Sequence, residues 1–207
     1  MNNHSLEAKL FHLNYAIITD FIEEHSKVLD LGCGDGSLIK MLIDEKQARA
    51  RGVDISQENV IKCIEKALSV TQGNIDDGLL EFADKSYDYV ILNQTLQSVR
   101  KPDFVIEEML RVGKKVVVSF PNFGYWKIRF YLFFKGKMPK SKILPFSWYD
   151  TPNIHLLTIK DFFDFIKGNN IKNLNSIYMT KGKKYKSLLV KKTANFLAEE
   201  VIFVISK

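Results

Sequence analysis

The feature that most constrains the fold is a regular alternation of short β-branched runs with stretches of helical period. Such alternation is typical of a parallel sheet whose strands are joined by crossover helices. We therefore expect a doubly wound, Rossmann-like α/β sheet of seven strands. The strands that the pattern predicts are 27–31, a run ending at 52–55, 69–72, 87–92, 115–120, 176–180 and 201–206.

Helices are expected in the intervals between these strands. Apolar residues recur about every 3.6 positions from Leu6 to Glu24, and Pro102 suits the first turn of a helix that continues to about Val112. Further helices are predicted from the glycine loop to about residue 45, at 58–68 and at 158–168. Because no repeat or Gly/Ser-rich linker divides the 207 residues, we expect one domain over 1–207, with an insertion at about 123–155.

Composition excludes several classes of protein. No apolar run approaches the roughly 18 residues that a membrane span needs, and the N-terminal residues lack a basic region followed by an apolar stretch. The two cysteines, Cys33 and Cys63, are too few for a disulfide scaffold or a zinc ribbon, so we expect a reduced, cytoplasmic protein. The four histidines are scattered at 4, 12, 25 and 155, and we expect no metal.

The net charge of +6 is unevenly distributed along the chain. Residues 1–100 carry 10 Lys and Arg against 16 Asp and Glu, whereas residues 101–207 carry 20 against 8. This asymmetry is compatible with an anionic partner near the second half, or with lysines that only cover solvated faces. Four lysines lie close together around Gly182, at 181, 183, 184 and 186. Their tight spacing favours an exposed hairpin turn over a phosphate-binding surface, so we expect no nucleic acid.

The first predicted strand ends in a G-x-G-x-G loop formed by Gly32, Gly34 and Gly36. Glycines let a backbone turn tightly and approach a ligand closely. Ser37 stands where the dinucleotide-binding fingerprint has its third glycine, and the Lys-Ser/Thr pair of a phosphate-binding P-loop is missing. A pyrophosphate ligand is therefore disfavoured. Cys33 is better explained as a small residue of the loop than as a nucleophile.

Polar side chains follow the ends of the first four predicted strands. Asp30 suits an ammonium group, and Asp54 suits the two hydroxyls of a ribose. Ile55 could lie against an adenine, Asn74 could pair with the adenine edge, and Asn93 could reach an amino-acid end. The combination predicts a nucleoside cofactor with a cationic amino-acid head. The expected cofactor-binding residues are Asp30, Gly32, Cys33, Gly34, Asp54, Ile55, Asn74, Ile75 and Asn93.

Taken alone, each of these signals has a simpler interpretation. The glycine triplet could form an ordinary tight turn. Asp54 could cap a helix, since Ser56 and Glu58 follow it.

Together these residues resemble class I S-adenosylmethionine-dependent methyltransferases. The resemblance lies in Val28–Gly36, Asp54, Gly73–Asn74 and Tyr87–Leu92. It implies S-adenosylmethionine as cofactor, S-adenosylhomocysteine as product, and a seven-stranded sheet whose last strand, at 201–206, is antiparallel. In that family the residue at the adenine edge is commonly Asp. Here Asn74 takes that position and Asp76 follows two residues later, which leaves the choice between them open.

Five blocks resemble one subgroup, the MetW family of methionine biosynthesis proteins. These blocks are 29–36, 89–97, 108–113, 119–124 and 148–156. The resemblance implies a role beside the MetX acyltransferase in homoserine acylation. It leaves two hypotheses: a methyltransferase acting on a small-molecule acceptor, or a non-catalytic partner of MetX that senses S-adenosylmethionine. The chain lacks G-x-S-x-G, so it is not expected to be the acyltransferase itself.

The insertion carries the residues expected near a substrate. Trp126, Phe130, Phe133 and Phe134 recur at helical spacing. This stretch could cover the active site, bind a partner protein, lie on an acidic membrane surface, or form part of the core. We expect Trp126, with Trp148 and Tyr149 later in the insertion, to belong to a lid or substrate site.

The block around Trp148 also offers the only candidates for acid–base catalysis. His155 could act as a general base with Asp150 orienting it. In the alternative interpretation, Asp150 begins a turn with Pro152 and His155 bonds only to the backbone.

Overall fold

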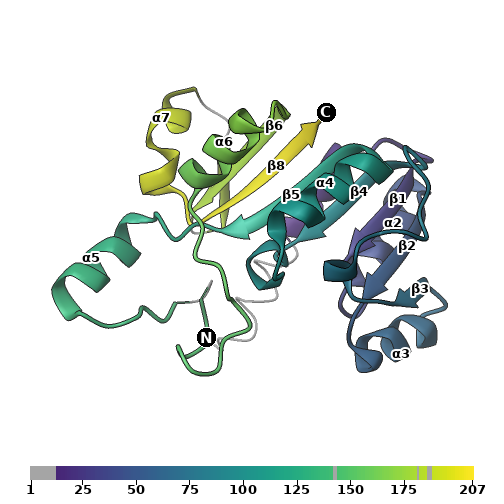
Figure 1. Ribbon diagram of the computed structural model, residues 1–207, viewed down its shortest axis with the longest axis horizontal. Coiled ribbons are helices and arrows are strands. Elements are labelled where there is room, and N and C mark those ends of the chain that lie inside the picture. The colour runs from purple at the N-terminus through teal and green to yellow at the C-terminus, as the bar shows by residue number, and fades with distance from the viewer. Residues whose placement is uncertain (1–12, 142–143, 181, 186–187) are drawn as a thin grey trace.

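An eight-stranded sheet forms the centre of the protein (Figure 1). The computed structural model describes residues 13–141, 144–180, 182–185 and 188–207. The strand order is β3-β2-β1-β4-β5-β8-β6-β7. The strands are β1 (Lys27–Leu31), β2 (Arg49–Asp54), β3 (Ser69–Gln72), β4 (Tyr87–Asn93), β5 (Gly113–Pro121), β6 (Lys172–Thr180), β7 (Lys183–Tyr185) and β8 (Glu200–Ser206).

The first five strands are parallel, and β8 lies antiparallel between β5 and β6. The predicted α/β sheet with a reversed last strand is thus confirmed. The predicted count of seven strands is wrong, because β7 adds an eighth. β7 is a short edge strand that pairs antiparallel with the end of β6. Its three residues, Lys-Lys-Tyr, are all exposed, so they lack the apolar alternation by which a strand is recognised.

The hairpin between β6 and β7 agrees with the turn predicted around Gly182, which has a positive φ of 69°. Lys183 and Lys184 lie in β7. The other two lysines of that cluster, at 181 and 186, lie outside the described residues.

The helices follow the prediction closely in the first half of the chain and less well in the second. They are α2 (Ser37–Lys46), α3 (Gln57–Glu65), α4 (Pro102–Val112), α5 (Trp126–Lys135), α6 (Ile159–Gly168) and α7 (Leu188–Leu197). Residues 13–21 are also helical, and the part of the predicted first helix before residue 13 lies outside the described residues. The sequence pattern does not predict α7.

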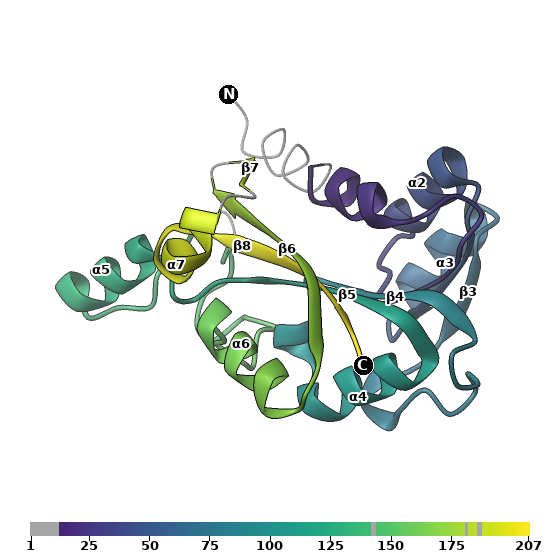
Figure 2. The ribbon, with the colours of Figure 1, turned by 90° about the horizontal axis from the view of Figure 1, so that it is seen from above.

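Helices cover both faces of the sheet, and each face has its own apolar core (Figure 2). Successive strand residues point to opposite faces. In β1, Leu29 and Leu31 pack with α4 and α6, whereas Val28 packs on the other side with Ile17 and with Ile39 of α2. All of these side chains are fully buried. The two layers hold the parallel strands rigidly, so the loops at their carboxyl ends have fixed positions.

The order of the strands reverses between β1 and β4. The chain proceeds outward from β1 to β2 and β3, and then returns to β4 on the other side of β1. In open α/β sheets, ligands bind at such a switch point, beside the carboxyl ends of the strands. The loops that follow β1, β2, β3 and β4 therefore define the region in which a ligand site is expected.

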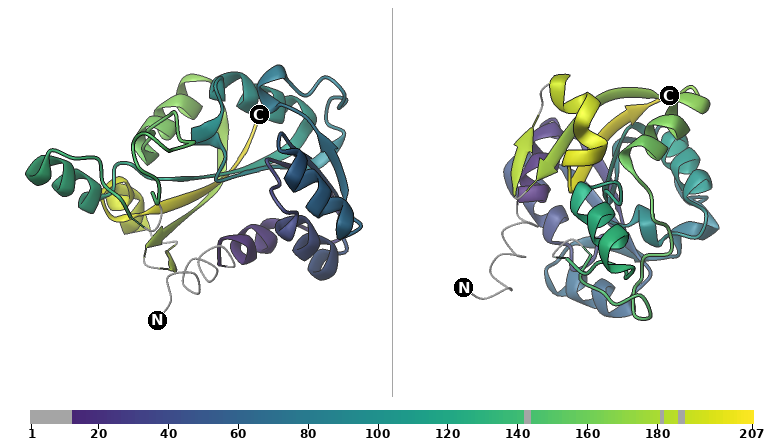
Figure 3. Two further views of the ribbon diagram at one scale, coloured as in Figure 1. Left: turned by 90° about the horizontal axis from the view of Figure 1, so that it is seen from below. Right: turned by 90° about the vertical axis from the view of Figure 1, so that its left-hand side faces the viewer.

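The helix of the insertion, α5, extends away from the sheet (Figures 1 and 3). Ile128 is its only buried residue, packed in a small cluster with Tyr125 and Leu144. The chain then returns toward the sheet, where the backbone N–H groups of Ile154 and His155 donate to the carbonyl oxygen of Gln97 at 2.9 and 3.0 Å. Of the helices in the described part of the chain, none has the length and hydropathy to span a membrane.

Candidate functional site

The loop after β1 is held close to the ends of two other strands. Gly32, Gly34 and Gly36 have φ values of 68°, 57° and 77°, which glycine adopts most readily. The N–H of Gly32 donates to the carbonyl of Val53 in β2 at 2.8 Å. A Cβ atom on Gly32 would lie 2.8 Å from the Oγ1 atom of Thr95, which follows β4. A side chain at position 32 would therefore push the two loops apart.

The middle glycine faces open space. A Cβ atom built on Gly34 would meet no heavy atom within 4 Å, whereas one on Gly36 would lie 2.5 Å from Leu68. Gly36 thus lets the loop pack on α3 and β3. Gly34 leaves an uncovered stretch of backbone, which a ligand can approach.

Asp54, at the end of β2, holds this loop in place. Its carboxylate accepts hydrogen bonds from the backbone N–H of Gly34 at 2.8 Å and of Ser56 at 2.9 Å. The side-chain amide of Asn59 donates a third bond at 3.1 Å. Asp54 is only 6% exposed. The helix-cap interpretation is partly right, since Asp54 binds the N–H of Ser56, and Ser56 is the N-cap residue of α3.

Asp30 is a buried carboxyl without a counter-charge. It is 2% exposed, and burial raises its pKa from 3.8 to about 8, with a further contribution from the negative charge of Asp54. Among the described residues, no Lys, Arg or His forms an ion pair with it. Tyr15 lies in the same electrostatic environment: burial, together with the negative charges of Asp30 and Asp35, raises its pKa to about 12.

The loops after β2 and β3 expose one apolar and one polar side chain. Ile55 is 67% exposed, although it is a large aliphatic residue beside a buried strand end. Asn74 is also exposed, and its Oδ1 atom accepts from the N–H of Asp76 at 3.1 Å. The side chain of Ile75 lies in the core, so only its backbone could contact a ligand.

The structure also bears on the choice between Asn74 and Asp76. The Oδ1 atom of Asp76 accepts from the N–H groups of Arg100 and Lys101, at 2.9 and 3.1 Å. Asp76 therefore ties the loop after β4 to the loop after β3. Among the described residues, the hydrogen bonds of Asn74 stay within its own turn, so Asn74 is the freer of the two to contact a ligand.

Asn93 ends β4 beside the glycine loop. Its Oδ1 atom accepts a hydrogen bond from the hydroxyl of Ser119 in β5, and its carbonyl accepts from the hydroxyl of Thr95 at 2.9 Å. These bonds fix the start of the loop that approaches Gly32.

Cys33 serves as a small buried residue of the loop. It is 8% exposed and packs in the core, with its Sγ atom against Gly52. Burial is the largest of the effects that raise the pKa of its thiol well above the usual value, so the thiolate is disfavoured. Among the described residues, no group of three or more His, Cys, Asp or Glu side chains comes close enough to hold a metal ion.

The residues expected near a substrate lie in different environments. Trp126 is partly buried against Tyr125 and Phe130. Trp148 and Tyr149 are each 75% exposed and pack edge to face, with ring centroids 5.5 Å apart. Trp148 also lines a shallow groove, whose other walls include Phe123, Leu144, Phe146 and Leu156.

Asp150 and His155 bond to different parts of the backbone. Asp150 is exposed, and its N–H donates to the carbonyl of Ser147 in a turn. His155 bonds through its backbone to Gln97, and its Nε2 atom is buried without a partner. No hydrogen bond joins the two side chains among the described residues, and the expectation that Asp150 orients His155 stays a prediction.

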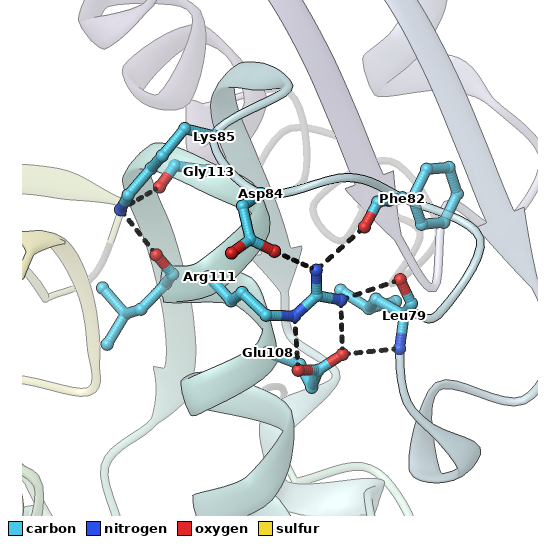
Figure 4. Close-up of polar contacts among 8 residues, drawn as sticks. Leu79, Phe82, Asp84, Lys85, Glu108, Arg111 and Gly113 are labelled. Atoms are coloured by element: carbon cyan, nitrogen blue, oxygen red, sulfur yellow. Dashed lines mark hydrogen bonds and ion pairs between the residues drawn. The ribbon is translucent and has the colours of Figure 1, made fainter.

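The block at 108–113 has a structural role away from this site (Figure 4). Arg111 forms two hydrogen bonds of 2.7 Å to Glu108 and also binds Asp84 at 2.7 Å. Its guanidinium donates to the carbonyls of Leu79 and Phe82 as well. Arg111 thereby fastens the segment before β4 to α4, near the amino end of the sheet.

Sequence reasoning missed two residues of the loop after β4, Gln94 and Gln97. Gln97 is 6% exposed. The Nε2 atom of Gln94 and the Oε1 atom of Gln97 are buried without a hydrogen-bond partner among the described residues. Both lie in the block 89–97, and two amides three residues apart after a buried strand are the signal that could have identified them.

Solved structures share this architecture. A SAM-dependent methyltransferase from Archaeoglobus fulgidus superposes with a TM-score of 0.69 at 15% identity, over 100% of this chain and 95% of that one. The strand order, the reversed strand β8 and this likeness define the class: the chain has the Rossmann-like fold of S-adenosylmethionine-dependent methyltransferases. Within that class, the profile of the family described as methionine biosynthesis protein MetW matches residues 12–205. The chain belongs to the MetW family.

Curated relatives agree with this assignment. The bifunctional methionine biosynthesis protein MetXA/MetW of Rhodopirellula baltica is 37% identical over 163 residues, which are 74% of this chain and 26% of that protein. A demethylmenaquinone methyltransferase of Listeria welshimeri is 31% identical over 136 residues, which are 57% of this chain and 56% of that protein. The chain thus spans about a quarter of the length of the first relative and just over half of the second.

Proposed function

We propose that this protein binds S-adenosylmethionine at the carboxyl ends of β1 to β4 and transfers its methyl group to a small-molecule acceptor. The observation that carries the proposal is Asp30, a buried carboxyl at the base of the glycine loop that forms no ion pair with a Lys, Arg or His of the described residues. The cationic amino-acid end of the cofactor would supply the missing charge.

The other residues of the site fit the cofactor equally well. Gly34 leaves room for close approach, and the uncovered face of Ile55 suits an adenine ring. Asp54 uses two oxygens for three bonds, and a carboxylate can accept about four. We therefore assign the ribose hydroxyls to Asp54, the adenine edge to Asn74 and the amino-acid end to Asp30 and Asn93.

When bound, the cofactor supplies an activated methyl group on a sulfonium, which is a good leaving group. The protein's part is then to hold donor and acceptor in line and to exclude water, and such positioning can contribute about 7–11 kcal/mol to lowering a barrier. This proposal requires no acid–base residue of the chain. His155, whose N–H bonds to Gln97, is a candidate for that role close to the loop after β4.

Both described cysteines are free thiols, which agrees with a protein of the reduced cytoplasm.

The first test is calorimetric titration with S-adenosylmethionine and S-adenosylhomocysteine. Asp54→Ala is a poor probe, because Asp54 also holds the glycine loop. Ile55→Ala is better, since Ile55 is exposed and contributes little to the core. We expect it to weaken binding about tenfold, from the loss of apolar contact with adenine. Ile64→Ala, on the exposed side of α3, is the matched control. Failure of the wild-type protein to bind either compound would overturn the proposal.

A second candidate function is a non-catalytic partner of the MetX homoserine O-acyltransferase that senses S-adenosylmethionine. Two observations favour this function. The relative named MetXA/MetW is one bifunctional polypeptide, and α5 has exposed aromatic residues. Labelled methyl donor separates the two functions. An enzyme converts it to S-adenosylhomocysteine when an acceptor is present, whereas a sensor binds it without turnover and changes the acylation rate of MetX.

A further inference from the structure

Three buried polar atoms without partners belong to residues that adjoin the proposed cofactor site. They are Nε2 of Gln94, Oε1 of Gln97 and Nε2 of His155, and each is buried without a hydrogen-bond partner in the described part of the chain. The three residues are joined to one another. The Nε2 atom of Gln97 donates to the carbonyl of Gln94 at 2.7 Å, and the N–H of His155 donates to the carbonyl of Gln97 at 3.0 Å.

Buried polar atoms without hydrogen-bond partners lower the stability of a protein unless a ligand pairs with them. Leaving a buried donor or acceptor unpaired costs about 1–3 kcal/mol. Gln97 is 6% exposed. An apolar residue of similar size at this position would bury no unpaired oxygen. The bond from its Nε2 atom to Gln94 fixes the orientation of the amide, so the Oε1 atom is the group left without a partner.

The position of the group relates it to the cofactor site. Thr95, between the two glutamines, lies against Gly32 of the glycine loop. Asn93, which we assign to the amino-acid end of the cofactor, immediately precedes Gln94. His155 reaches the same loop from the insertion. The three residues therefore belong to segments that adjoin the proposed cofactor site, from which an acceptor group could be bound.

We propose that Gln94, Gln97 and His155 bind an uncharged polar group of the methyl acceptor, either a hydroxyl or a carboxamide. This inference rests on the proposed function. Gln94 offers an N–H donor, Gln97 an acceptor, and the imidazole nitrogen of His155 can serve as either. A hydroxyl or a carboxamide both donates and accepts, so it satisfies all three.

The surroundings disfavour a charged ligand group. In the described residues, the hydrogen bonds of Gln94, Gln97 and His155 involve no Lys, Arg, Asp or Glu side chain. A carboxylate would face the lone pairs of Gln97 Oε1, and an ammonium would face the N–H of Gln94. Neither would gain a counter-charge from the hydrogen-bond partners of these residues in exchange for its lost hydration.

The test uses four probes with the same carbon chain: butanamide, 1-butanol, butyrate and butylammonium. The protein is labelled with ¹³C at the Cε1 position of histidine and saturated with S-adenosylhomocysteine. The signal of His155 is assigned by its absence in His155→Asn. We expect butanamide and 1-butanol to shift this signal saturably, and butyrate and butylammonium to leave it in place. Equal shifts by all four probes, or no shift by any, would overturn the inference.

A pair of variants identifies the binding residue. Gln97→Met keeps the length of the side chain and removes its oxygen, together with the N–H that donates to the carbonyl of Gln94. We expect it to weaken butanamide binding at least fivefold while its affinity for S-adenosylhomocysteine stays the same. Gln57→Met, on the exposed first turn of α3, is the control and should match the wild type. Wild-type affinity for butanamide in Gln97→Met would contradict the inference.

Calorimetry with S-adenosylhomocysteine separates this inference from the proposed function. If the wild type does not bind that compound, the proposed function fails, and the probes are then titrated into the free protein. If it binds that compound but the probes behave contrary to expectation, only the acceptor subsite is wrong.

Discussion

At the scale of single residues, the three glycines of the loop after β1 have different roles despite similar backbone angles. Gly36→Ala would place a Cβ atom 2.5 Å from Leu68 and should destabilise the fold, whereas Gly34→Ala would place one in open space. We expect Gly34→Ala to lower the free energy of unfolding by only about 1–2 kcal/mol, from its left-handed backbone, and to abolish measurable cofactor binding. Urea unfolding and calorimetry on both variants check this. Normal cofactor binding by Gly34→Ala would show that no ligand approaches that backbone.

Asp30 gives a prediction about pH. Its raised pKa of about 8 means that the carboxyl is protonated in the free protein at pH 6. A cationic ligand favours the ionised form, so binding should release a proton, and affinity should rise between pH 6 and 8 and level off above. Calorimetry in two buffers of different ionisation enthalpy measures the release. Asp30→Asn should bind more weakly and release none from this group.

The same carboxyl affects stability with a definite sign. Between its ordinary pKa of 3.8 and the raised value of about 8, the unfolded chain is ionised while the folded protein keeps the proton. The contribution of Asp30 to the free energy of unfolding should therefore fall as the pH rises through this range. Asp30→Asn should lack this slope. An equal slope in the variant, measured by urea unfolding at several pH values, would argue against the raised pKa.

The sequence predicts the positions of some of these residues in the fold, but not of others. Asp30, Asp54 and Asn93 could be predicted, because the carboxyl end of a parallel strand is a position fixed by the pattern. Ile75 lies next to Asn74 but points into the core, since one residue along the backbone reverses the direction of a side chain. Gln97 was missed because its significance lies in an unpartnered oxygen, which depends on three-dimensional neighbours.

At the scale of elements, a residue at each end of α4 fixes the helix. Pro102 begins the helix, and Arg111 in its last turn fastens the segment before β4 (Figure 4). Arg111→Lys cannot reproduce the paired bonds to Glu108. We expect it to lower the free energy of unfolding by about 2–3 kcal/mol, with cofactor affinity unchanged. Arg100→Lys, at an exposed position, should change neither quantity.

The insertion is the element for which sequence reasoning was least complete. The spacing of its aromatic residues indicates a helix, and α5 is a helix. Spacing alone does not show whether its apolar side is covered, and Phe133 and Phe134 are 81% and 69% exposed. This exposure favours a partner-binding role over a place in the core.

A variant of α5 tests that role. Phe133→Ser combined with Phe134→Ser should leave the melting temperature unchanged and weaken binding to purified MetX acyltransferase at least tenfold. Leu80→Ser, at a position 88% exposed on the body of the protein, is the control. Equal affinity of the α5 variant and the wild type for MetX would remove α5 from the interface.

At the scale of the whole molecule, the strand order places all proposed cofactor residues on the β3-β2-β1-β4 side of the sheet. The alternation of strands and helices predicts a doubly wound sheet, and the family resemblance implies its reversed last strand. β7 could not be predicted, because three exposed residues at an edge carry no periodic signal. A ligand bound only to the folded protein at a hundred times its dissociation constant adds about 2.7 kcal/mol of stability. We expect S-adenosylmethionine to raise the melting temperature by about 5–10 °C. Ile55→Ala should show a smaller rise at the same ligand concentration.

The antiparallel strand β8 has a consequence for the order in which the protein can fold. It lies between β5 and β6, yet it comes after both of them, and after the other five strands of the sheet, in chain order. Until residues 200–206 have left the ribosome, β5 ends the growing sheet with an unpaired, apolar edge, and β6 has no partner on that side. Nascent chains of this protein therefore pass through a stage that invites edge-to-edge association. Slower synthesis, or loss of β8, would prolong the stage in which chaperones are needed most.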